Sequence, residues 1–240
     1  VAVLVSGQMR GYENSVTRLK EILAGTKTKF FIHTWENNGV NKKSSNKYSR
    51  VYPTIFSNLL TELVTFTKLE HIEDSLRKID EIIFPDALVT ETELKESYGP
   101  ETQIVIEKDR KMSSNHEKMY YKMFKAHELL EESEEFDLYI RIRPDLVIEF
   151  NDPFDINNVY NTIKDSNIVF TERGYAYSYY GYGIDDKFSI CNKETMKIYS
   201  SVWKSWSQNK EKTSLVGHVD LARVLMDNGI GSYSLEKMAK

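Results

Sequence analysis

The chain opens with a short, unbroken run of hydrophobic residues. Residues 1–5 are all apolar, and Ser6 and Gly7 end the run. A run of this kind, without polar alternation, is typical of a strand that is buried on both faces, as in a parallel sheet. Residues 29–35 form a second, mostly apolar run and predict another strand.

Between these strands, the apolar positions follow the period of a helix. Val16, Leu19 and Leu23 lie on one helix face. Ser15 is a typical N-terminal cap and Gly25 a typical C-terminal stop, so the pattern predicts a helix between them. A strand followed by a helix is the first half of a βαβ unit.

The two patterns alternate along the rest of the chain. The polar residues 36–50 predict a long surface loop, and residues 52–94 carry helical patterning. A helix of about four or five turns is expected from Asn115 onward, followed by a strand at residues 136–143. Further strands are expected at residues 167–171 and 187–192, and further helices at residues 194–206 and 214–226. The sequence therefore predicts one α/β domain over residues 1–240, with a mixed, mostly parallel central sheet flanked by helices.

The composition argues against several classes of protein. Of the 240 residues, 40% are hydrophobic and 28% are charged, as in an ordinary globular domain. A net charge of −4 provides no positive field for nucleic acid. The single cysteine, Cys191, cannot form an internal disulfide or a thiolate zinc module. No apolar run approaches the roughly 20 residues that cross a bilayer, so we expect a cytoplasmic protein, with peripheral membrane contact left open.

Polar residues and glycines follow the first predicted strand. In an open α/β sheet, ligands bind beyond the carboxyl ends of the strands, near the N-termini of helices. Ser6, Gly7, Gln8 and Arg10 stand at such a position. Glycine lets the backbone approach a ligand, and the polar side chains can hydrogen-bond it. Because the spacing is not GxGxxG, a structural turn with an exposed arginine explains these residues as well.

A second group of candidates follows the strand predicted at residues 136–143. Alternation places Arg141 and Arg143 on one side of this strand, where arginines are costly to bury without partners. Pro144 ends the ladder of hydrogen bonds, so we expect Asp145 at the strand end, facing a cleft. A carboxylate there suits Mg²⁺ or Mn²⁺ bound to phosphate. The alternative is a structural ion pair with one of the two arginines.

The helix before this strand carries a stripe of lysines. Lys118, Lys122 and Lys125 lie on one face, and Lys122 is the candidate for contact with a diphosphate. Pairing with Glu128 and Glu132 at the surface is the simpler explanation for any single lysine.

Tyrosines, glycines and two adjacent acids precede the strand predicted at residues 187–192. Tyrosine can line the face of a sugar ring, and glycine allows close approach of a bulky ligand. Asp186 or Asp185 can serve as a general base, although a plain acidic turn explains the pair equally well. The candidates for contact with a sugar or an acceptor are Tyr180, Gly181, Tyr182 and Gly183.

His218 lies near the start of the last predicted helix. It shares a face with Leu221 and Leu225, which is usual for a partly buried structural histidine; the alternative is a ligand for a metal or a phosphate. The sequence has no Ser-His-Asp order, P-loop, HExxH or CxxC motif. It therefore lacks the key motifs of serine hydrolases and Walker-type kinases.

Five blocks of the sequence occur in an order that resembles a known family. They are Leu4-Val5-Ser6-Gly7-Gln8-Met9-Arg10, Phe31-Ile32-His33-Thr34-Trp35, Met119-Tyr120-Tyr121-Lys122-Met123, Ile140-Arg141-Ile142-Arg143-Pro144-Asp145-Leu146 and Asp185-Asp186-Lys187-Phe188. In these blocks the chain resembles the GT-A-type glycosyltransferases of bacterial surface-polysaccharide clusters and some large viruses. A weaker match covers residues 218–225.

The resemblance implies a nucleotide-binding half over residues 1–150 and an acceptor and catalytic half over residues 151–240. In this family a DxD motif holds the metal and the diphosphate, and Arg143-Pro144-Asp145 occupies its place here. Because Arg143 replaces the first carboxylate, it can neutralise the diphosphate directly, and dependence on Mn²⁺ or Mg²⁺ stays open. The resemblance also aligns the glycine loop with Gly181 and Gly183, the catalytic-acid region with Asp185 and Asp186, and a late metal-binding histidine with His218.

These features predict transfer of a sugar from a nucleoside diphosphate donor to a hydroxyl of a glycan or related acceptor, in the synthesis of surface polysaccharides or glycoconjugates. Gly7, Arg10, Asp145 and Asp186 are expected to converge on one cleft. The alternatives are a non-catalytic carbohydrate-binding or scaffold domain and a nucleotidyltransferase. The residues expected to bind the donor are Ser6, Gly7, Gln8, Arg10, Lys122, Arg141, Arg143 and Asp145.

Overall fold

Most of the chain outside the segment 38–87 is described by the computed structural model. The described residues are 1–37, 88–110, 112, 114–131, 133, 135–148, 154–172, 174–178, 181–208 and 216–235. Contacts within the chain define two compact units, Val1–Glu36 with Val89–Lys240, and Asn37–Leu88. The helices and strands described below belong to the first unit, so the single domain of residues 1–240 and its two halves stay a prediction.

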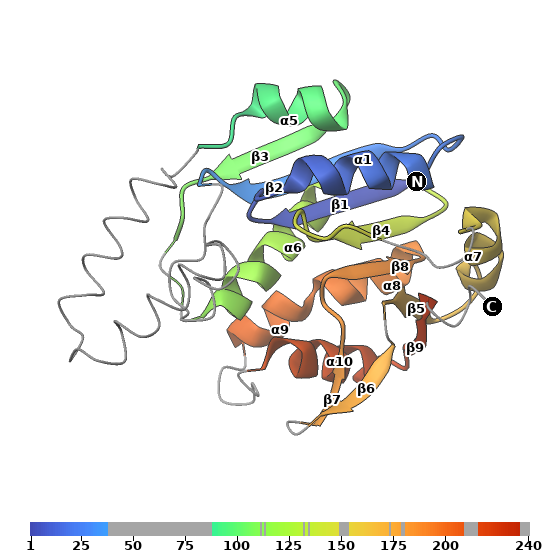
Figure 1. The fold of residues 1–240 in the computed structure, drawn as a ribbon. Helices are drawn as coiled ribbons and strands as arrows, with labels where there is room; N and C mark the ends of the chain where they lie inside the picture. Colours follow the sequence, from blue (N-terminus) through green and yellow to red (C-terminus); the bar gives the residue numbers. More distant parts are fainter. Residues whose placement is uncertain are drawn as a thin grey trace, which may run out of the picture. The chain divides into compact units, whose positions relative to one another are not determined.

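A seven-stranded sheet with the order β3-β2-β1-β4-β8-β5-β9 forms the centre of the first unit (Figure 1). β1 pairs in parallel with β2 and β4, whereas β8 runs antiparallel to both of its neighbours. The predicted α/β fold with a mixed, mostly parallel sheet is thereby confirmed. The strands are β1 (Ala2–Gly7), β2 (Lys29–Trp35), β3 (Gln103–Glu107), β4 (Tyr139–Ile142), β5 (Ile168–Thr171), β8 (Phe188–Cys191) and β9 (Gly231–Ser234).

Helices flank the sheet, and alternate residues of β1 enter two separate hydrophobic clusters. Val3 and Val5 belong to the cluster that includes residues of α1, α5 and α7, whereas Ala2 and Leu4 belong to the cluster with residues of α6, α8, α9 and α10. The prediction of a strand buried on both faces is confirmed. The helices are α1 (Tyr12–Ile22), α5 (Glu91–Tyr98), α6 (Asn115–Glu131), α7 (Ile156–Ile163), α8 (Lys193–Ser200), α9 (Val202–Gln208) and α10 (Gly217–Asp227).

The first helix begins before the residue that was expected to cap it. α1 starts at Tyr12, and Gly11 in the cap position is left-handed, with a φ of 66°. Ser15 lies inside the helix, and its hydroxyl donates to the carbonyl oxygen of Leu146 at 2.6 Å. The prediction of Ser15 as a cap is therefore wrong, because its hydroxyl makes a tertiary contact instead.

Other segments also differ from the sequence pattern. Gly181–Ile184 is not a loop but strand β7, which pairs antiparallel with β6 (Tyr175–Ser178). The helix expected at residues 194–206 is interrupted at Ser201, between α8 and α9. The pattern also missed β3, α5 and α7. The helices expected within residues 52–87 lie outside the described residues.

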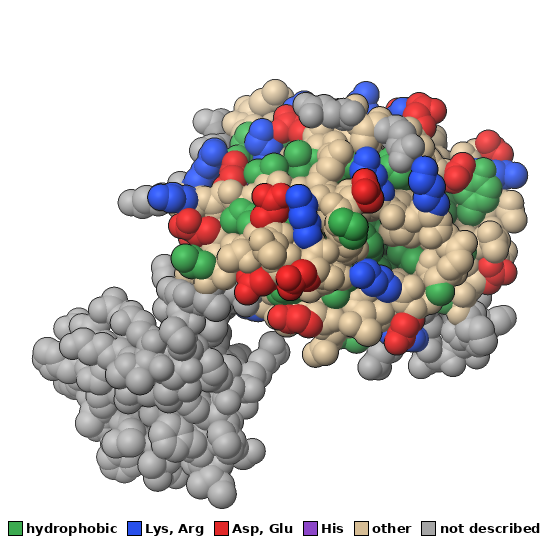
Figure 2. All heavy atoms as spheres, turned by 90° about the horizontal axis from the view of Figure 1, so that it is seen from above, with side chains coloured by type: hydrophobic (Ala, Val, Ile, Leu, Met, Phe, Trp, Pro, Cys, Tyr) green, Lys and Arg blue, Asp and Glu red, His purple; other side chains and the backbone are tan. Residues whose placement is uncertain are grey.

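The surface seen from above the view of Figure 1 carries both signs of charge. Figure 2 shows basic and acidic side chains intermixed on this face, without an extended area of one sign. Among the described helices, none is both long and apolar enough to cross a membrane.

Candidate functional site

The turn after β1 packs against the end of β4. β1 and β4 are parallel neighbours, so their carboxyl ends meet at the same edge of the sheet. Gly7 has a φ of 136°, which residues with a side chain rarely adopt, and a methyl group added there would lie 3.3 Å from Pro144 Cδ. The close approach that Gly7 permits is therefore to Pro144. The turn carries Arg10 toward Asp145.

Two arginines converge on the carboxylate of Asp145. Nε and Nη2 of Arg143 donate to Oδ1 and Oδ2, each at 2.8 Å. Nη2 of Arg10 donates to Oδ2 at 3.1 Å. The expected proximity of Arg10 and Asp145 is confirmed, as is the ion pair with Arg143. Both arginine side chains keep exposed surface, 41% for Arg10 and 30% for Arg143, so a ligand can reach them.

These contacts shift the pKa values of Asp145 and Arg143. Burial pushes the pKa of Asp145 up, but hydrogen bonds and charge from Arg143 and Arg10 outweigh it, and the pKa lies below its usual value. The hydrogen bond to Asp145 raises the pKa of Arg143, and the charges of Asp186 and Asp185 add to this increase. Asp145 is therefore ionised at neutral pH and orients both guanidinium groups.

The two adjacent acids reach the same edge because they precede β8, which is antiparallel to β4. The backbone N–H of Arg143 donates to the carbonyl oxygen of Lys187 at 2.8 Å and holds the segment beside β4. Oδ1 of Asp185 accepts from the N–H of Lys187 at 3.0 Å, which makes Asp185 part of a turn. Within the described residues, Asp186 acts on Arg143 through its charge alone. Among the described residues, the carboxylate of Asp186, unlike that of Asp185, accepts no hydrogen bond.

Arg141 is completely buried below this edge. Its Nε donates to Oγ of Ser6 at 3.3 Å, whereas Nη1 and Nη2 have no hydrogen-bond partner among the described residues. Ile140 and Ile142 enter the cluster on the other face of the sheet, as the alternation predicts. Two residues expected to bind the donor, Ser6 and Arg141, are therefore bonded to each other and have no exposed surface.

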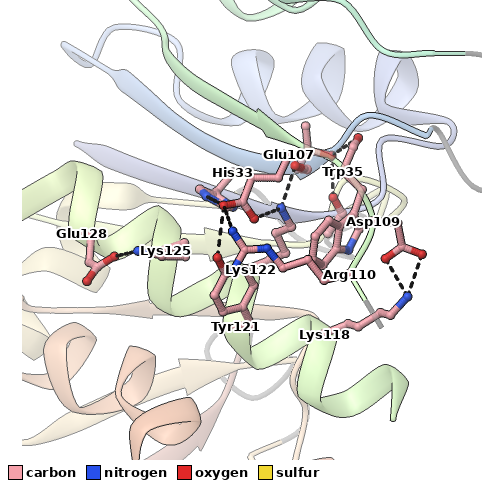
Figure 3. Close-up of polar contacts among 12 residues, drawn as sticks. His33, Trp35, Glu107, Asp109, Arg110, Lys118, Tyr121, Lys122, Lys125 and Glu128 are labelled. Carbon is pink, nitrogen blue, oxygen red and sulfur yellow. Dashed lines mark hydrogen bonds and ion pairs between the residues drawn. The ribbon is translucent and has the colours of Figure 1, made fainter. Parts of the chain in front are cut away.

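A second carboxylate, Glu107 at the end of β3, anchors a network with α6 (Figure 3). Nζ of Lys122 donates to Oε2 of Glu107 at 3.0 Å and to the carbonyl oxygen of Thr34 at 2.8 Å. The hydroxyl of Tyr121 and Nη2 of Arg110 donate to Oε1 at 3.1 and 3.2 Å. The side chain of Lys122 is fully buried, so the structure directs this lysine into the network and not toward an open surface.

Burial lowers the pKa values of two basic side chains in this network. It lowers the pKa of Lys122 to about 8, although Glu107 opposes the change. Nζ of Lys122 also lies 3.4 Å from the ring centroid of Trp35, a cation–π contact that stabilises the charge. Burial, together with the charge of Lys122, lowers the pKa of His33 to about 3, so this imidazole is neutral.

The outer lysines of the stripe are paired at the surface. Nζ of Lys118 donates to Oδ1 of Asp109 at 2.6 Å, and Lys125 donates to Glu128 (Figure 3). The simpler explanation of the stripe, pairing with acids, is confirmed for Lys125. Glu132 lies outside the described residues.

The residues expected to contact a sugar lie on or next to β7. A methyl group added at Gly183 would lie 2.5 Å from Cδ2 of His218, so the space left by this glycine is filled by a histidine of α10. Gly181 has a φ of 116°, and Tyr182 is 59% exposed. Tyr180 lies outside the described residues. Tyr182 is therefore the tyrosine of this group with a described surface for a ligand.

The donors around Asp145 do not fit a divalent cation. Both carboxylate oxygens accept from guanidinium groups, and these positive charges repel a cation. Throughout the described residues, no group of three or more His, Cys, Asp or Glu side chains lies in a metal-binding arrangement. Asp145 therefore does not fit the metal-binding role that the resemblance gives it together with His218.

Sequence patterns missed the network around Glu107. Residues 103–107 form a short run in which Ile104 and Ile106 alternate with other residues, a signal for a strand that ends in an acid. The same rule that singled out Asp145, an acid at a strand end, would have found Glu107. No local signal pairs it with Lys122.

Comparisons with known proteins add distant structural similarities. No protein-family model matches this chain, and no curated protein sequence matches it significantly. The solved structure of the galactosyltransferase LgtC in complex with donor and acceptor sugar analogues aligns with 96% of this chain and 72% of its own, at 9% identity and a TM-score of 0.47. An active-site mutant of LgtC aligns with 96% of this chain and 71% of its own, at 9% identity and a TM-score of 0.45. At this identity and these TM-scores the two alignments carry no argument. The fold class therefore rests on the order and pairing of the strands in the sheet.

Proposed function

We propose that this protein is a GT-A-type glycosyltransferase that moves a sugar from a nucleoside diphosphate sugar to a hydroxyl of a glycan or related acceptor, in the synthesis of surface polysaccharides or glycoconjugates. The observation that supports this most directly is the convergence of Arg10 and Arg143 on Asp145, with Asp186 beside them. They lie at the carboxyl edge of the parallel strands, where α/β sheets bind nucleotides. The sequence resemblance points to the same residues.

In the proposed reaction, Arg10 and Arg143 neutralise the leaving diphosphate. Asp145 accepts hydrogen bonds from one N–H of Arg10 and two of Arg143 and fixes their orientation. The remaining N–H groups of the two planar guanidinium groups then donate hydrogen bonds to phosphate oxygens. As the bond between the sugar and the diphosphate breaks, the positive charges of Arg10 and Arg143 stabilise the negative charge on the departing oxygen.

For transfer with inversion at the anomeric carbon, Asp186 is the proposed general base. It removes the proton of the acceptor hydroxyl while the hydroxyl oxygen attacks the anomeric carbon, and the bond to the diphosphate breaks on the opposite side. Asp185 is less suited to this role because its carboxylate already accepts from the backbone of Lys187. A positioned base typically accelerates such a step by about a hundredfold to ten-thousandfold.

Thermal unfolding with a panel of nucleoside diphosphates and nucleotide sugars tests the proposal. A ligand at about 100 times its dissociation constant stabilises a protein by about 2.7 kcal/mol, which gives a measurable rise in Tm. We expect Arg10→Gln and Arg143→Gln to reduce the response. Arg110→Gln is the matched control, because Arg110 also binds a carboxylate at a strand end but lies in the Glu107 network.

The same panel separates the alternatives. Slow release of nucleoside diphosphate from a nucleotide sugar supports the transferase. No response to any ligand supports a non-catalytic scaffold, and release of pyrophosphate from a nucleoside triphosphate supports nucleotidyl transfer.

A further inference from the structure

The start of α10 presents backbone N–H groups that are not capped. α10 begins at Gly217, and Val216 in the cap position makes no capping hydrogen bond with its side chain. The N–H groups of Val219 and Asp220 donate to the carbonyl oxygen of Val216. Those of Gly217 and His218 donate to no acceptor among the described residues. Such groups form the positive end of the helix dipole.

The acid in the first turn of α10, Asp220, is paired with other side chains, although its charge still acts on Tyr120. Oδ2 of Asp220 accepts from Nε1 of Trp206 at 2.9 Å, and Oδ1 pairs with Arg223 at 3.1 Å. Its carboxylate is 1% exposed and held by these partners. These hydrogen bonds do not use the N–H groups of Gly217 and His218, which can donate to an external acceptor.

A buried tyrosine points toward the same place. The side chain of Tyr120 is completely buried, and its hydroxyl has no hydrogen-bond partner among the described residues. A methyl group added at Gly217 would lie 3.1 Å from this hydroxyl oxygen. Burial raises the pKa of Tyr120 well above its usual value, so the hydroxyl keeps its proton and can donate it. A buried donor without an acceptor is destabilising, and a bound acceptor would remove this cost.

His116 completes the surroundings of Gly217. It precedes Tyr120 by one helical turn on α6, and its Cδ2 would lie 2.8 Å from a methyl group at Gly217. Glycine is thus the residue that lets both side chains approach the start of α10. The charge of Arg141, whose Nη1 and Nη2 are unpartnered among the described residues, also acts on Tyr120.

We propose that the start of α10, together with Tyr120 and His116, binds a phosphate group. Two backbone N–H groups and a hydroxyl donate, and the helix dipole and Arg141 favour negative charge while Asp186 and Asp220 oppose it, so the donors fit an oxyanion with several acceptor oxygens. This site is distinct from the arginine pair at Asp145, and Asp186 is a neighbour of both because its charge acts on Arg143 and on Tyr120. The phosphate belongs either to the donor or to a phosphorylated acceptor.

Nuclear magnetic resonance of protein labelled with ¹⁵N-glycine tests this site directly. The chain has 11 glycines, so the spectrum is simple, and the signal of Gly217 is identified by its loss in Gly217→Ala. On titration with inorganic phosphate, we expect the Gly217 amide to shift in a saturable way. Tyr120→Phe should weaken binding by about threefold to tenfold, the value of one hydrogen bond.

Tyr199→Phe is the matched control for the weaker phosphate binding expected of Tyr120→Phe. Tyr199 is also completely buried, and its hydroxyl also lacks a partner among the described residues, but it lies on α8. The Tyr199→Phe variant should bind phosphate as tightly as the unmodified protein. A Gly217 amide that does not shift at tens of millimolar phosphate would overturn the proposal. So would equal weakening by both tyrosine substitutions.

Two further ligands identify the source of the phosphate and separate this proposal from the transferase. A nucleoside diphosphate that shifts Gly7 and Gly217 together assigns the phosphate to the donor, whereas a sugar phosphate that shifts Gly217 alone assigns it to the acceptor. If Gly7 responds and Gly217 responds to no phosphate compound, the site is wrong and the transferase stands. If Gly217 responds to inorganic phosphate and no nucleotide binds, the site stands and the transferase fails.

Discussion

Two carboxylates at the same edge of the sheet each bind a cation at close range, yet they build different regions. Asp145 binds Arg10 and Arg143, whose side chains are 41% and 30% exposed. Glu107 binds Lys122, whose side chain is fully buried. An exposed guanidinium can replace hydrogen bonds to water with hydrogen bonds to a phosphate. A buried ammonium cannot reach a phosphate without breaking the ion pair that offsets the cost of its burial. Glu107 also pairs with Arg110, which is 56% exposed, so the fully buried ammonium of Lys122, and not the presence of an ion pair, separates the structural network from the candidate site.

The largest expected effect is on the chemistry beside Asp145. Asp186→Asn removes the proposed base while keeping its shape, so the rate constant for transfer should fall by about a hundredfold to ten-thousandfold. Donor affinity, measured by calorimetry, should change little, because the base acts only as the acceptor attacks. Asp185→Asn is the matched control and should have a smaller effect. Equal, small losses at both positions would contradict the assignment and indicate an acidic turn.

Removing the charge of Glu107 should lower the stability of the protein. Glu107→Gln leaves the ammonium of Lys122 buried without its charge partner, so the free energy of unfolding should fall by about 3–5 kcal/mol. Denaturation with urea measures this loss. Asp109→Asn, which removes the partner of the partly exposed Lys118, should cost only about 0–1 kcal/mol. Similar losses in the two variants would end the distinction between a buried network and a surface pair.

The same network should make the protein sensitive to acid. The pKa of His33 is about 3 in the folded protein and 6.5 in an unfolded chain. Between these values the unfolded chain binds a proton that the folded protein does not, so stability falls as the pH drops, by about 1.4 kcal/mol for each pH unit. His33→Phe should reduce this slope below pH 6, measured by urea denaturation. Parallel stability curves for the two proteins would show that His33 is not responsible.

At Asp145 we expect a small effect on stability, in the same range as for Asp109→Asn. Asp145→Asn keeps the shape of the side chain, and because Arg10 and Arg143 are partly exposed, water can solvate them; the free energy of unfolding should change by less than about 1 kcal/mol. The arginines lose their orientation, so donor affinity should fall about tenfold, equivalent to about 1.4 kcal/mol. A variant that is clearly less stable but binds the donor normally would place Asp145 with the structural network.

The pattern of the sequence by itself determined the class of fold and where to look for chemistry. Hydrophobic period is a local property, so residues 1–5 and the helix from Asn115 onward were recognisable without any partner. A polar residue at a strand end is also a local feature, which is why Arg10 and Asp145 were singled out. Ser15 was misassigned because a capping hydroxyl and a hydroxyl in a tertiary contact look the same in sequence.

Only the tertiary structure decided which groups pair and which are buried. The hydrogen bond between Arg10 and Asp145 joins residues 135 positions apart, and the bond between Lys122 and Glu107 joins residues 15 positions apart on different elements. Whether Asp145 binds a metal ion or arginines, and whether Lys122 faces a ligand or the interior, depends on what the sheet and α6 bring next to each residue. Pairing and burial set the electrostatic energy of a charged group, and both arise from contacts between segments that the chain leaves far apart until it folds.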